Sequence, residues 1–542
     1  MIVSRLPTAA PACPPATGKG PVATLIDPTA AAFLLAENRS MPMHVGALQL
    51  FEPPADAGPD WTRGMYEALR DAGDVSDLFV RHPYRSLRTA GQLVWLPDHQ
   101  LDLEHHVRHN ALPRPGRYRE LFELCSRLHS QRLAWERPLW ESHVIEGLDD
   151  GRVAVYTKLH HSLMDGVAGM RLLQSVLSPD PDARDVPAPW SMQAGRPHLG
   201  ATPPRPDTPA SPAAGHDAGH DAAPHGLDEV PDEHDLDLEP GVQPLPAGTD
   251  TLLHAALASR DVLEELGSGL RAGLDVLTEA AGLPGALARG VLQGATNHTG
   301  ALSFHAPRTL FNRPITGSRR FAADDWEVER LKAVGKASGS TLNDVVLAMT
   351  SGAMRRYLLE QDALPPTPLV AMVPVALRAA RSHLSATGGG NAIGAVMAPL
   401  GTHLADPADR LAQVSASMSE GKRALATMTP TQILAMSALG QAPAILAPML
   451  GLGRLVRPPY NLVISNVPGP RQPLYWNGAR LVGTYPLSIP ISGMALNITC
   501  TSYTGQMAFG VTGCRRTVPS LQRMLTHLDT ELGELERAVG VA

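Results

Sequence analysis

The segment His160–Gly166, with the sequence HHSLMDG, brings two imidazoles, a carboxylate and a glycine together within seven residues. Residues Arg152–Leu159, directly before it, include VAVYTKL, in which β-branched and aromatic residues recur at near-alternating positions, and this pattern predicts a strand. Residues Val167–Leu177, directly after it, predict a helix. The heptad therefore forms the turn between a strand and a helix, and we expect a mixed α/β fold around it.

The polar groups of the heptad have separate chemical tasks. An imidazole with an ordinary pKa of about 6.5 can take a proton from an alcohol at neutral pH and return it to a leaving group. Asp165 is expected to cap the free amides at the start of the following helix, and Gly166 to allow a tight turn where a side chain would collide. A bare pair of histidines would more often be ordinary polar residues, but the full heptad favours general acid–base catalysis.

Two α/β units with a long connection are expected. The chain has 542 residues, more than a single core usually supports. We predict a flexible N-terminus (1–20), a first domain (21–180), a disordered linker rich in Pro, Asp and His (181–250), an interdomain helical segment (251–299) and a second domain (300–542). Expected strands are His44–Pro53, Leu369–Val375, Asn461–Ser465 and Ala495–Thr501, and expected helices are Trp61–Ala72, Asp325–Ala337 and Leu342–Leu359.

The charge distribution excludes one class of partner. Residues 181–250 hold 13 acidic and 3 basic side chains, so that the rest of the chain is close to neutral although the net charge is −7. Without a basic stripe, nucleic-acid binding is not expected. The histidines of GHDAGHD (215–221) allow a metal site, but a solvated low-complexity tract is favoured because no packed surroundings would hold the ligands. We expect no metal site.

Cysteines and apolar runs bear on location. Four cysteines are scattered without a CxxC pair, which argues against a disulfide framework and suits a cytoplasmic protein. An uncharged run at 424–453 approaches the length of a membrane span, but Pro430, Pro443 and Pro448 would break a single helix. Two interpretations stay open for this run: an interfacial or substrate-facing helical region, or ordinary buried helices of the second domain.

Further segments accompany the heptad in a fixed order. They are PMHVGALQLFEP (42–53), RPLWESHVIEGL (137–148), KLHHSLMDGVAG (158–169), NRPITGSRRFA (312–322), TLNDVVLAMTSGAMRRYL (341–358), VPVALR (373–378), GGNAIG (389–394) and SNVPGP (465–470). Together they resemble the wax ester synthase/diacylglycerol acyltransferase family of bacterial O-acyltransferases. That family belongs to the HHxxxDG superfamily, which also contains other coenzyme A-dependent acyltransferases and peptide-synthetase condensation domains.

The resemblance implies a fold and an assignment of the heptad. The fold would be two mixed-sheet α/β domains of the chloramphenicol acetyltransferase type. His161 would be the general base, and His160 would shape the pocket. Asp165 would be structural and would pair with an arginine across the fold, for which Arg378 is the candidate.

Other motif residues receive roles by the same resemblance. Asn343 and Asp344 would lie near the active site and orient substrate or the oxyanion, although Asn343 is equally well interpreted as a helix N-cap. Pro138, Leu139 and Trp140 match a PLW motif, which is more often a packing feature than a chemical one. Asn466 would line the acyl channel or, equally, form a turn with the Val-Pro-Gly that follows.

The implied activity is transfer of a long-chain acyl group from acyl-CoA to diacylglycerol or to a long-chain fatty alcohol, giving triacylglycerol or wax ester. No cofactor is expected, because acyl-CoA is a substrate. A monomer or homodimer associated with the inner membrane or with lipid inclusions would fit such substrates. Two alternatives remain: a non-catalytic lipid-binding protein on the same fold, and a condensation-domain-like enzyme that forms an amide or ester.

Overall fold

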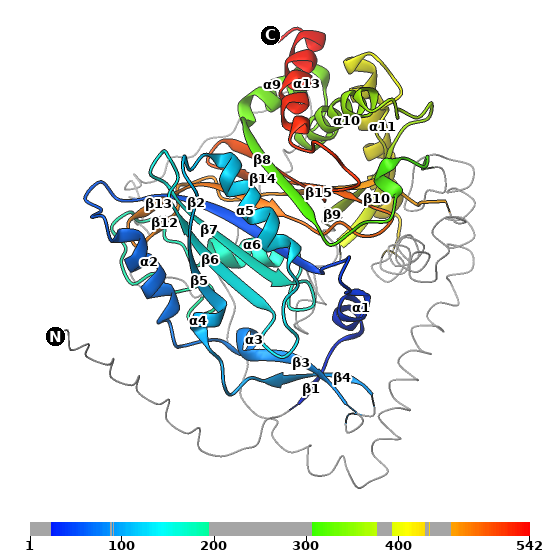
Figure 1. Ribbon diagram of the computed structural model, residues 1–542. Coiled ribbons are helices and arrows are strands. Elements are labelled where there is room, and N and C mark those ends of the chain that lie inside the picture. The colour runs from blue at the N-terminus through cyan, green and yellow to red at the C-terminus, as the bar shows by residue number, and fades with distance from the viewer. Residues whose placement is uncertain are drawn as a thin grey trace, which may run out of the picture. The chain divides into compact units, whose positions relative to one another are not determined.

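The computed structural model describes residues 23–86, 89, 91–194, 306–376, 393–428, 433 and 457–541. Its elements form two six-stranded mixed sheets, one small antiparallel sheet and the helices that cover them (Figure 1). The predicted mixed α/β architecture with two sheets is confirmed. The predicted N-terminal segment 1–20, the helical segment 251–299 and most of the linker lie outside the described residues, as does nearly all of the uncharged run at 424–453.

The first large sheet carries the heptad. Its strands run in the order β12-β13-β2-β7-β6-β5. The central strand β7 has all eight residues buried, because both of its faces are covered. The bounds are β2 His44–Glu52, β5 Val107–Ala111, β6 Trp140–Glu146, β7 Val153–His160, β12 Tyr475–Trp476 and β13 Ala479–Leu487.

Helices and a small sheet surround this first sheet. Strands β1, β4 and β3 form the small sheet. Lys158 of β7 extends its ammonium group to the carbonyls of Leu128 and Gln131, which anchors the end of α5 on the face opposite the heptad helix α6. The bounds are β1 Thr24–Leu25, α1 Pro28–Ala36, α2 Trp61–Arg70, α3 Asp77–Val80, β3 Arg81–Arg85, β4 Leu93–Pro97, α4 Leu103–His106, α5 Tyr118–Ser130 and α6 Gly166–Ser175.

The second large sheet has the order β10-β9-β11-β14-β15-β8. Helices α10, α11 and α13 gather on one side of it (Figure 1) and form the largest hydrophobic core with it. The bounds are η3 Leu310–Asn312, β8 Arg319–Glu327, α9 Val328–Ser338, α10 Leu342–Glu360, β9 Val370–Ala376, β10 Ile393–Pro399, α11 Pro407–Ala426, β11 Leu462–Val467, β14 Leu496–Tyr503, β15 Gln506–Cys514 and α13 Arg523–Val539.

The two halves of the chain exchange structure, which corrects the predicted domain boundaries. Strand β13 comes from the second half but pairs antiparallel with β2 of the first sheet. Conversely, α5 satisfies the edge of the second sheet: Ser126 Oγ accepts from the amide of Phe321, and Ser130 Oγ from the amide of Arg319. A division at residue 300 therefore separates strands that share one sheet.

The start of the predicted linker is also corrected. Val186, Ala188 and Trp190 are buried in the core of the first sheet, and the Trp190 ring stacks on Trp140 with centroids 4.8 Å apart. Because the segment is rich in proline, the sequence pattern did not indicate that these three apolar residues belong to a core. The first domain consequently extends to at least residue 194, and residues 195–305 lie outside the described part of the chain.

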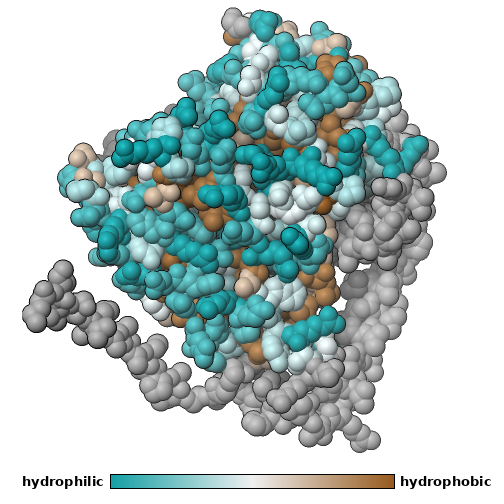
Figure 2. Space-filling view, in the orientation of Figure 1, coloured by the Kyte–Doolittle hydropathy of each residue, from teal (hydrophilic) through white to brown (hydrophobic). Residues whose placement is uncertain are grey.

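The face drawn in Figure 2 is largely hydrophilic, with small scattered hydrophobic patches. Scattered apolar residues of this kind are usual on proteins. Within the ranges that the structure describes, no helix combines the length and apolar composition needed to cross a bilayer.

Candidate active site

A cavity of about 840 Å³ lies where the two large sheets face each other, and it is lined mainly by apolar side chains. The first sheet contributes β2, β7, α6 and α1, and the second contributes β9, β11 and β14. Polar groups are few and include His161, Asp165, Ser465, Asn497 and Thr499. A mostly apolar cavity with a few convergent polar groups is the usual form of a small-molecule site.

His161 lies on the wall of this cavity, directly after the last residue of β7. Its ring stacks on Phe33 of α1 with centroids 4.1 Å apart. Its backbone amide donates to the carbonyl of Met43 at 2.8 Å, which fixes the turn against the segment before β2. Burial lowers the pKa of His161 below the usual 6.5, and the carboxylate of Asp165 opposes this shift. The imidazole is therefore neutral at pH 7, the form that can accept a proton.

Asp165 and Gly166 also line the cavity. Asp165 is the N-cap of α6, and its Oδ1 accepts from the amide of Ala168 at 2.7 Å, as expected from the sequence. The expected reason for Gly166 is wrong, because a Cβ there would have only Val45 Cγ1 nearby, at 4.0 Å. The glycine is not required by the turn, and its lack of a side chain keeps the cavity beside His161 open.

His160 does not line the cavity but lies buried on the other face of β7. Its Nδ1 accepts from the amide of Ser162 at 3.1 Å, so the neutral ring carries its proton on Nε2, which lies 3.8 Å from Glu37 Oε1. Burial lowers the pKa of His160 to about 4, against the attraction of Glu37. His160 therefore contacts the turn and Glu37, and it is not among the residues that line the cavity.

Glu37 is a functional residue that the sequence motifs did not reveal. Its buried side chain accepts from the amide of Met43 at 3.2 Å, from Arg132 Nη2 at 2.9 Å and from Trp135 Nε1 at 3.0 Å. It therefore holds the backbone of Met43, the residue whose carbonyl accepts from the amide of His161. Glu37 lies only six residues before Met43, but nothing in the local sequence pattern showed that its side chain binds the Met43 amide.

The PLW motif, Pro138 to Trp140, lies beside the end of β7. Leu139 and Trp140 are fully buried, and the carbonyl of Leu139 accepts from the amide of His160 at 3.0 Å. Trp140 Nε1 donates to the carbonyl of Phe79 at 2.9 Å. Pro138 precedes this strand and its carbonyl accepts from the amide of Trp140. The motif thus supports the end of β7 from behind.

Two predicted substrate-binding residues, Asn343 and Asp344, are not among the residues that line the cavity. The N-cap of α10 is Thr341 rather than Asn343, and Asp344 closes a capping box with Thr341 while Ser415 Oγ donates to it at 3.2 Å. Both Asn343 and Asp344 therefore belong to the start of a helix on the outer side of the second sheet. The predicted ionic partner of Asp165, Arg378, lies outside the described residues.

Asn466 is also corrected. Its neighbours Ser465 and Val467 line the cavity, so the alternation of β11 directs Asn466 to the opposite face. It is a strand residue, paired in register with Cys500, and not part of the turn that follows.

Asn497 on β14 supplies an amide to the cavity that the sequence did not reveal. Thr499 Oγ1 donates to Asn497 Oδ1 at 3.1 Å, and both residues line the cavity. Because the carbonyl oxygen already accepts from Thr499, the NH₂ group is the part of this amide that can donate to a ligand. It is a donor on the wall contributed by the second sheet.

A buried cluster of charged and polar side chains lies on the first sheet, away from the cavity. Lys158 Nζ lies 3.1 Å from Glu141 Oε2, and His143 Nε2 lies 3.3 Å from the same oxygen. Although burial opposes the shift, these partners and Arg108 lower the pKa of Glu141 to about 2. No group of three or more potential metal ligands occurs among the described residues.

Comparisons with known proteins agree on one family. The family model "Wax ester synthase/diacylglycerol acyltransferase catalytic domain" matches residues 26–215 and 215–346, and "WS/DGAT C-terminal domain" matches residues 389–536. A Mycobacterium tuberculosis H37Rv protein named as a diacylglycerol O-acyltransferase is 44% identical over 517 residues, which is 95% of this chain and 100% of the relative. A second protein of that strain with the same kind of name is 43% identical over the same shares.

Solved structures give the same result. The wax ester synthase/diacylglycerol acyltransferase of Marinobacter aquaeolei VT8 has 37% sequence identity and a TM-score of 0.67, over 95% of this chain and 100% of that one. The first condensation domain of the CDA synthetase has a TM-score of 0.52 at 15% identity, over 96% and 97% of the two chains. The second likeness concerns the fold alone.

Proposed function

Because the chain belongs to the wax ester synthase/diacylglycerol acyltransferase family and is an acyltransferase, we propose that it transfers a long-chain acyl group from acyl-CoA to diacylglycerol, to a long-chain alcohol, or to both. The single observation that carries this proposal is the position of His161, neutral and half-buried, on the wall of a largely apolar cavity between the sheets. Both the acyl chain and the acceptor are apolar molecules that such a cavity would accept.

The reaction follows from general base catalysis. His161 takes the hydroxyl proton as the acceptor oxygen attacks the thioester carbonyl carbon, and a tetrahedral oxyanion forms. The carbon–sulfur bond then breaks, and the coenzyme A thiolate takes the proton back from His161. The products are an ester and free coenzyme A, with no net consumption of protons.

Asn497 is our candidate for stabilising the oxyanion, in place of Asn343. Asn497 lines the cavity on the wall contributed by the second sheet, whereas His161 lies on the wall contributed by the first, and Thr499 already binds the Asn497 carbonyl oxygen. A donor fixed in position before the reaction stabilises developing charge without reorganisation. Asn343, at the start of α10, has no comparable position.

The acceptor is the open part of the proposal. Names of the relatives point to diacylglycerol, whereas the Marinobacter protein is named for both wax ester and diacylglycerol chemistry. Release of coenzyme A should be measured with palmitoyl-CoA and either dioleoylglycerol or hexadecanol, comparing wild type, His161→Ala and the exposed-histidine control His99→Ala. Acceptor-dependent release that is lost only in His161→Ala supports the proposal; wild-type protein inactive with both acceptors would contradict it.

A non-catalytic lipid-binding protein is the competing function. It would need no base, yet the heptad turn is supported by Glu37, Met43 and Leu139 in a way that fixes His161 at the cavity wall. Association with a membrane or lipid inclusion belongs to the same proposal and is tested by flotation of the protein with liposomes.

A further inference from the structure

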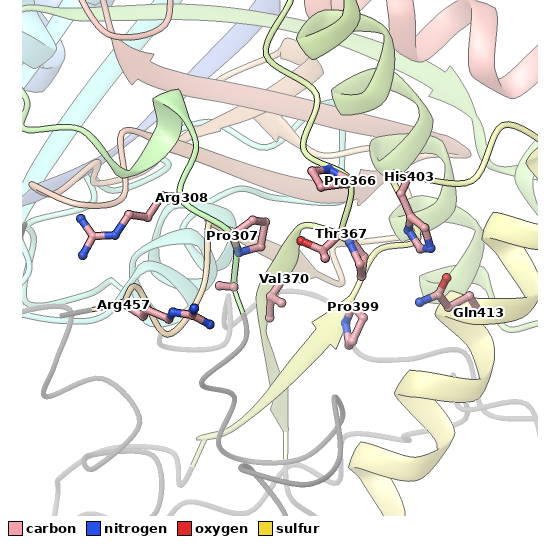
Figure 3. Close-up of a pocket in the computed structure, with 11 residues that line it drawn as sticks. Pro307, Arg308, Pro366, Thr367, Val370, Pro399, His403, Gln413 and Arg457 are labelled. Atoms are coloured by element: carbon pink, nitrogen blue, oxygen red, sulfur yellow. The ribbon is translucent and has the colours of Figure 1, made fainter. Parts of the chain in front are cut away.

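A second cavity of about 750 Å³ lies beside the active-site cavity, at the ends of β9 and β10. Its wall includes Arg308, Thr367, Val370, His403, Gln413 and Arg457. Figure 3 shows the two arginines on one side and His403 with Gln413 on the other, with Thr367 and Val370 between them. Four prolines complete the wall, so its backbone is stiff.

The charge of this cavity has one sign. Two guanidinium groups line it, and no aspartate or glutamate occurs among its described lining residues. His403 Nδ1 is buried without a hydrogen-bond partner in the described part of the chain, so one more polar nitrogen lies unused in this wall. Arginine, with its planar fork of donors, is the side chain best suited to phosphate.

The two cavities occupy one continuous face of the second sheet. Along β9, Val370 lines the second cavity while Met372 and Pro374 line the active-site cavity, and these alternate residues share a face. The four residue steps from Val370 to Pro374 span roughly 13 Å at about 3.3 Å per residue.

The segment before β11 also borders both cavities. Arg457 lines the second cavity, and Tyr460, three residues later, lines the active-site cavity. Tyr460 packs with Val370 and Val463 in a small apolar cluster, and each of these three residues lines one cavity or the other. An elongated ligand along this face would have an apolar end at His161 and a polar end at the arginines.

We infer that the second cavity binds the phosphorylated nucleotide end of the acyl-CoA donor, with Arg457 and Arg308 as its phosphate contacts. The inference rests on the proposed function, because it assigns one end of the same substrate. It explains why a basic, proline-walled space lies beside an apolar one. The thioester would then be presented to His161 by a ligand held at its far end.

The test compares a complete donor with a truncated one. Palmitoyl-CoA carries the phosphates, whereas the palmitoyl thioester of N-acetylcysteamine keeps the reacting group without them. Arg457→Ala is expected to raise the KM for palmitoyl-CoA by about tenfold or more, as for loss of a hydrogen bond to a charged group, with kcat nearly unchanged. The truncated donor should react equally well with both proteins.

Competition and a control variant separate nucleotide binding at this site from a general effect of positive charge. Adenosine 3′,5′-bisphosphate should compete with palmitoyl-CoA in the wild type and much less in Arg457→Ala, whereas the same concentration of inorganic phosphate or of phosphatidic acid in vesicles should not compete. The control Arg63→Ala removes an arginine that is exposed on α2 and paired with Glu67 in its own helix. It should leave both donors unaffected.

Calorimetric binding of coenzyme A makes the inference independent of turnover. Weaker binding of coenzyme A to Arg457→Ala than to wild type supports the site even if no acyl transfer is detected. An absence of acyl transfer would count only against the proposed function. Equal binding of coenzyme A to both proteins, or an equal loss of activity with both donors, would overturn the inference.

Discussion

The carbonyl of Met43 accepts a hydrogen bond from the amide of His161 at 2.8 Å, and this contact ties the proposed base to a segment more than a hundred residues earlier. Glu37 accepts from the amide of the same residue, Met43, at 3.2 Å and is itself held by Arg132 and Trp135. The orientation of the base therefore depends on a buried carboxylate that lies outside the cavity.

Glu37→Gln is expected to weaken this support. The amide keeps one acceptor oxygen but loses the charge that binds Arg132 and faces His160 Nε2, so the free energy of unfolding should fall by about 1–3 kcal/mol. The acyl-transfer rate should fall with it while the KM for acyl-CoA stays similar. Urea unfolding and steady-state kinetics measure the two effects.

The matched control is Glu67→Gln, which removes an exposed carboxylate paired with Arg63 on α2. It should change the free energy of unfolding by no more than about 0.5 kcal/mol. A Glu37→Gln protein as stable and as active as this control would show that Glu37 is not a positioning residue.

The local parts of the site were predictable, and the non-local parts were not. The strand, turn and helix around His161 and Asp165 follow from side-chain pattern and capping, which depend on near neighbours only. The role of Glu37 depends on the hydrogen bond between Met43 and His161, which are far apart in the sequence. No periodicity encodes such a contact. Asn466 was misplaced because a shift of one residue in a strand reverses the face to which a side chain points.

The same contrast applies to the fold. Two α/β units could be predicted from strand and helix patterns, but the pairing of β13 with β2 could not, because the two strands are more than four hundred residues apart. Similarly, Trp190 lies in a proline-rich tract, and its burial and its stacking on Trp140 show that it belongs to a core. Pairings over such distances are decided by tertiary packing.

Asp165→Asn should move the acid limb of the pH profile. The Asp165 carboxylate raises the pKa of His161 against the larger lowering by burial, so removing the charge lowers that pKa further. The base must be neutral to act, and therefore kcat/KM in the variant should persist to lower pH than in wild type, with little change above pH 7. Asparagine still caps the helix, so the fold should be retained.

The profile is measured as kcat/KM for palmitoyl-CoA from acid to neutral pH. An acid limb that stays in place would mean that Asp165 does not influence the charge of the base. A limb that moves to higher pH would contradict the neutral-base mechanism itself.

Asn497→Ala tests the proposed oxyanion donor. Loss of one such donor typically lowers kcat by about 10²–10³ while substrate binding is largely kept. Thr499→Val is the graded comparison, because it removes the hydroxyl that holds Asn497 Oδ1 but leaves the amide in place, and a smaller decrease is expected. A raised KM with unchanged kcat in Asn497→Ala would assign the residue to ground-state binding instead.

Substitution of Gly166 separates the needs of the fold from the needs of the reaction. A Cβ at Gly166 would meet nothing closer than Val45 Cγ1 at 4.0 Å, and Gly166 is the first residue of α6, where glycine is a poor helix former. Gly166→Leu should therefore fold with unchanged or slightly increased stability. Its side chain would, however, occupy the cavity beside His161 and exclude the acyl chain or the acceptor, so activity should fall by at least tenfold.

Gly166→Ala is the control, with the same gain in helix propensity and only one added methyl group, and it should retain most of the activity. The measurements are thermal unfolding and coenzyme A release for the wild type and both variants. If Gly166→Leu is fully active, substrate does not use the space next to Gly166. If both variants unfold at a lower temperature than the wild type, the turn requires the glycine.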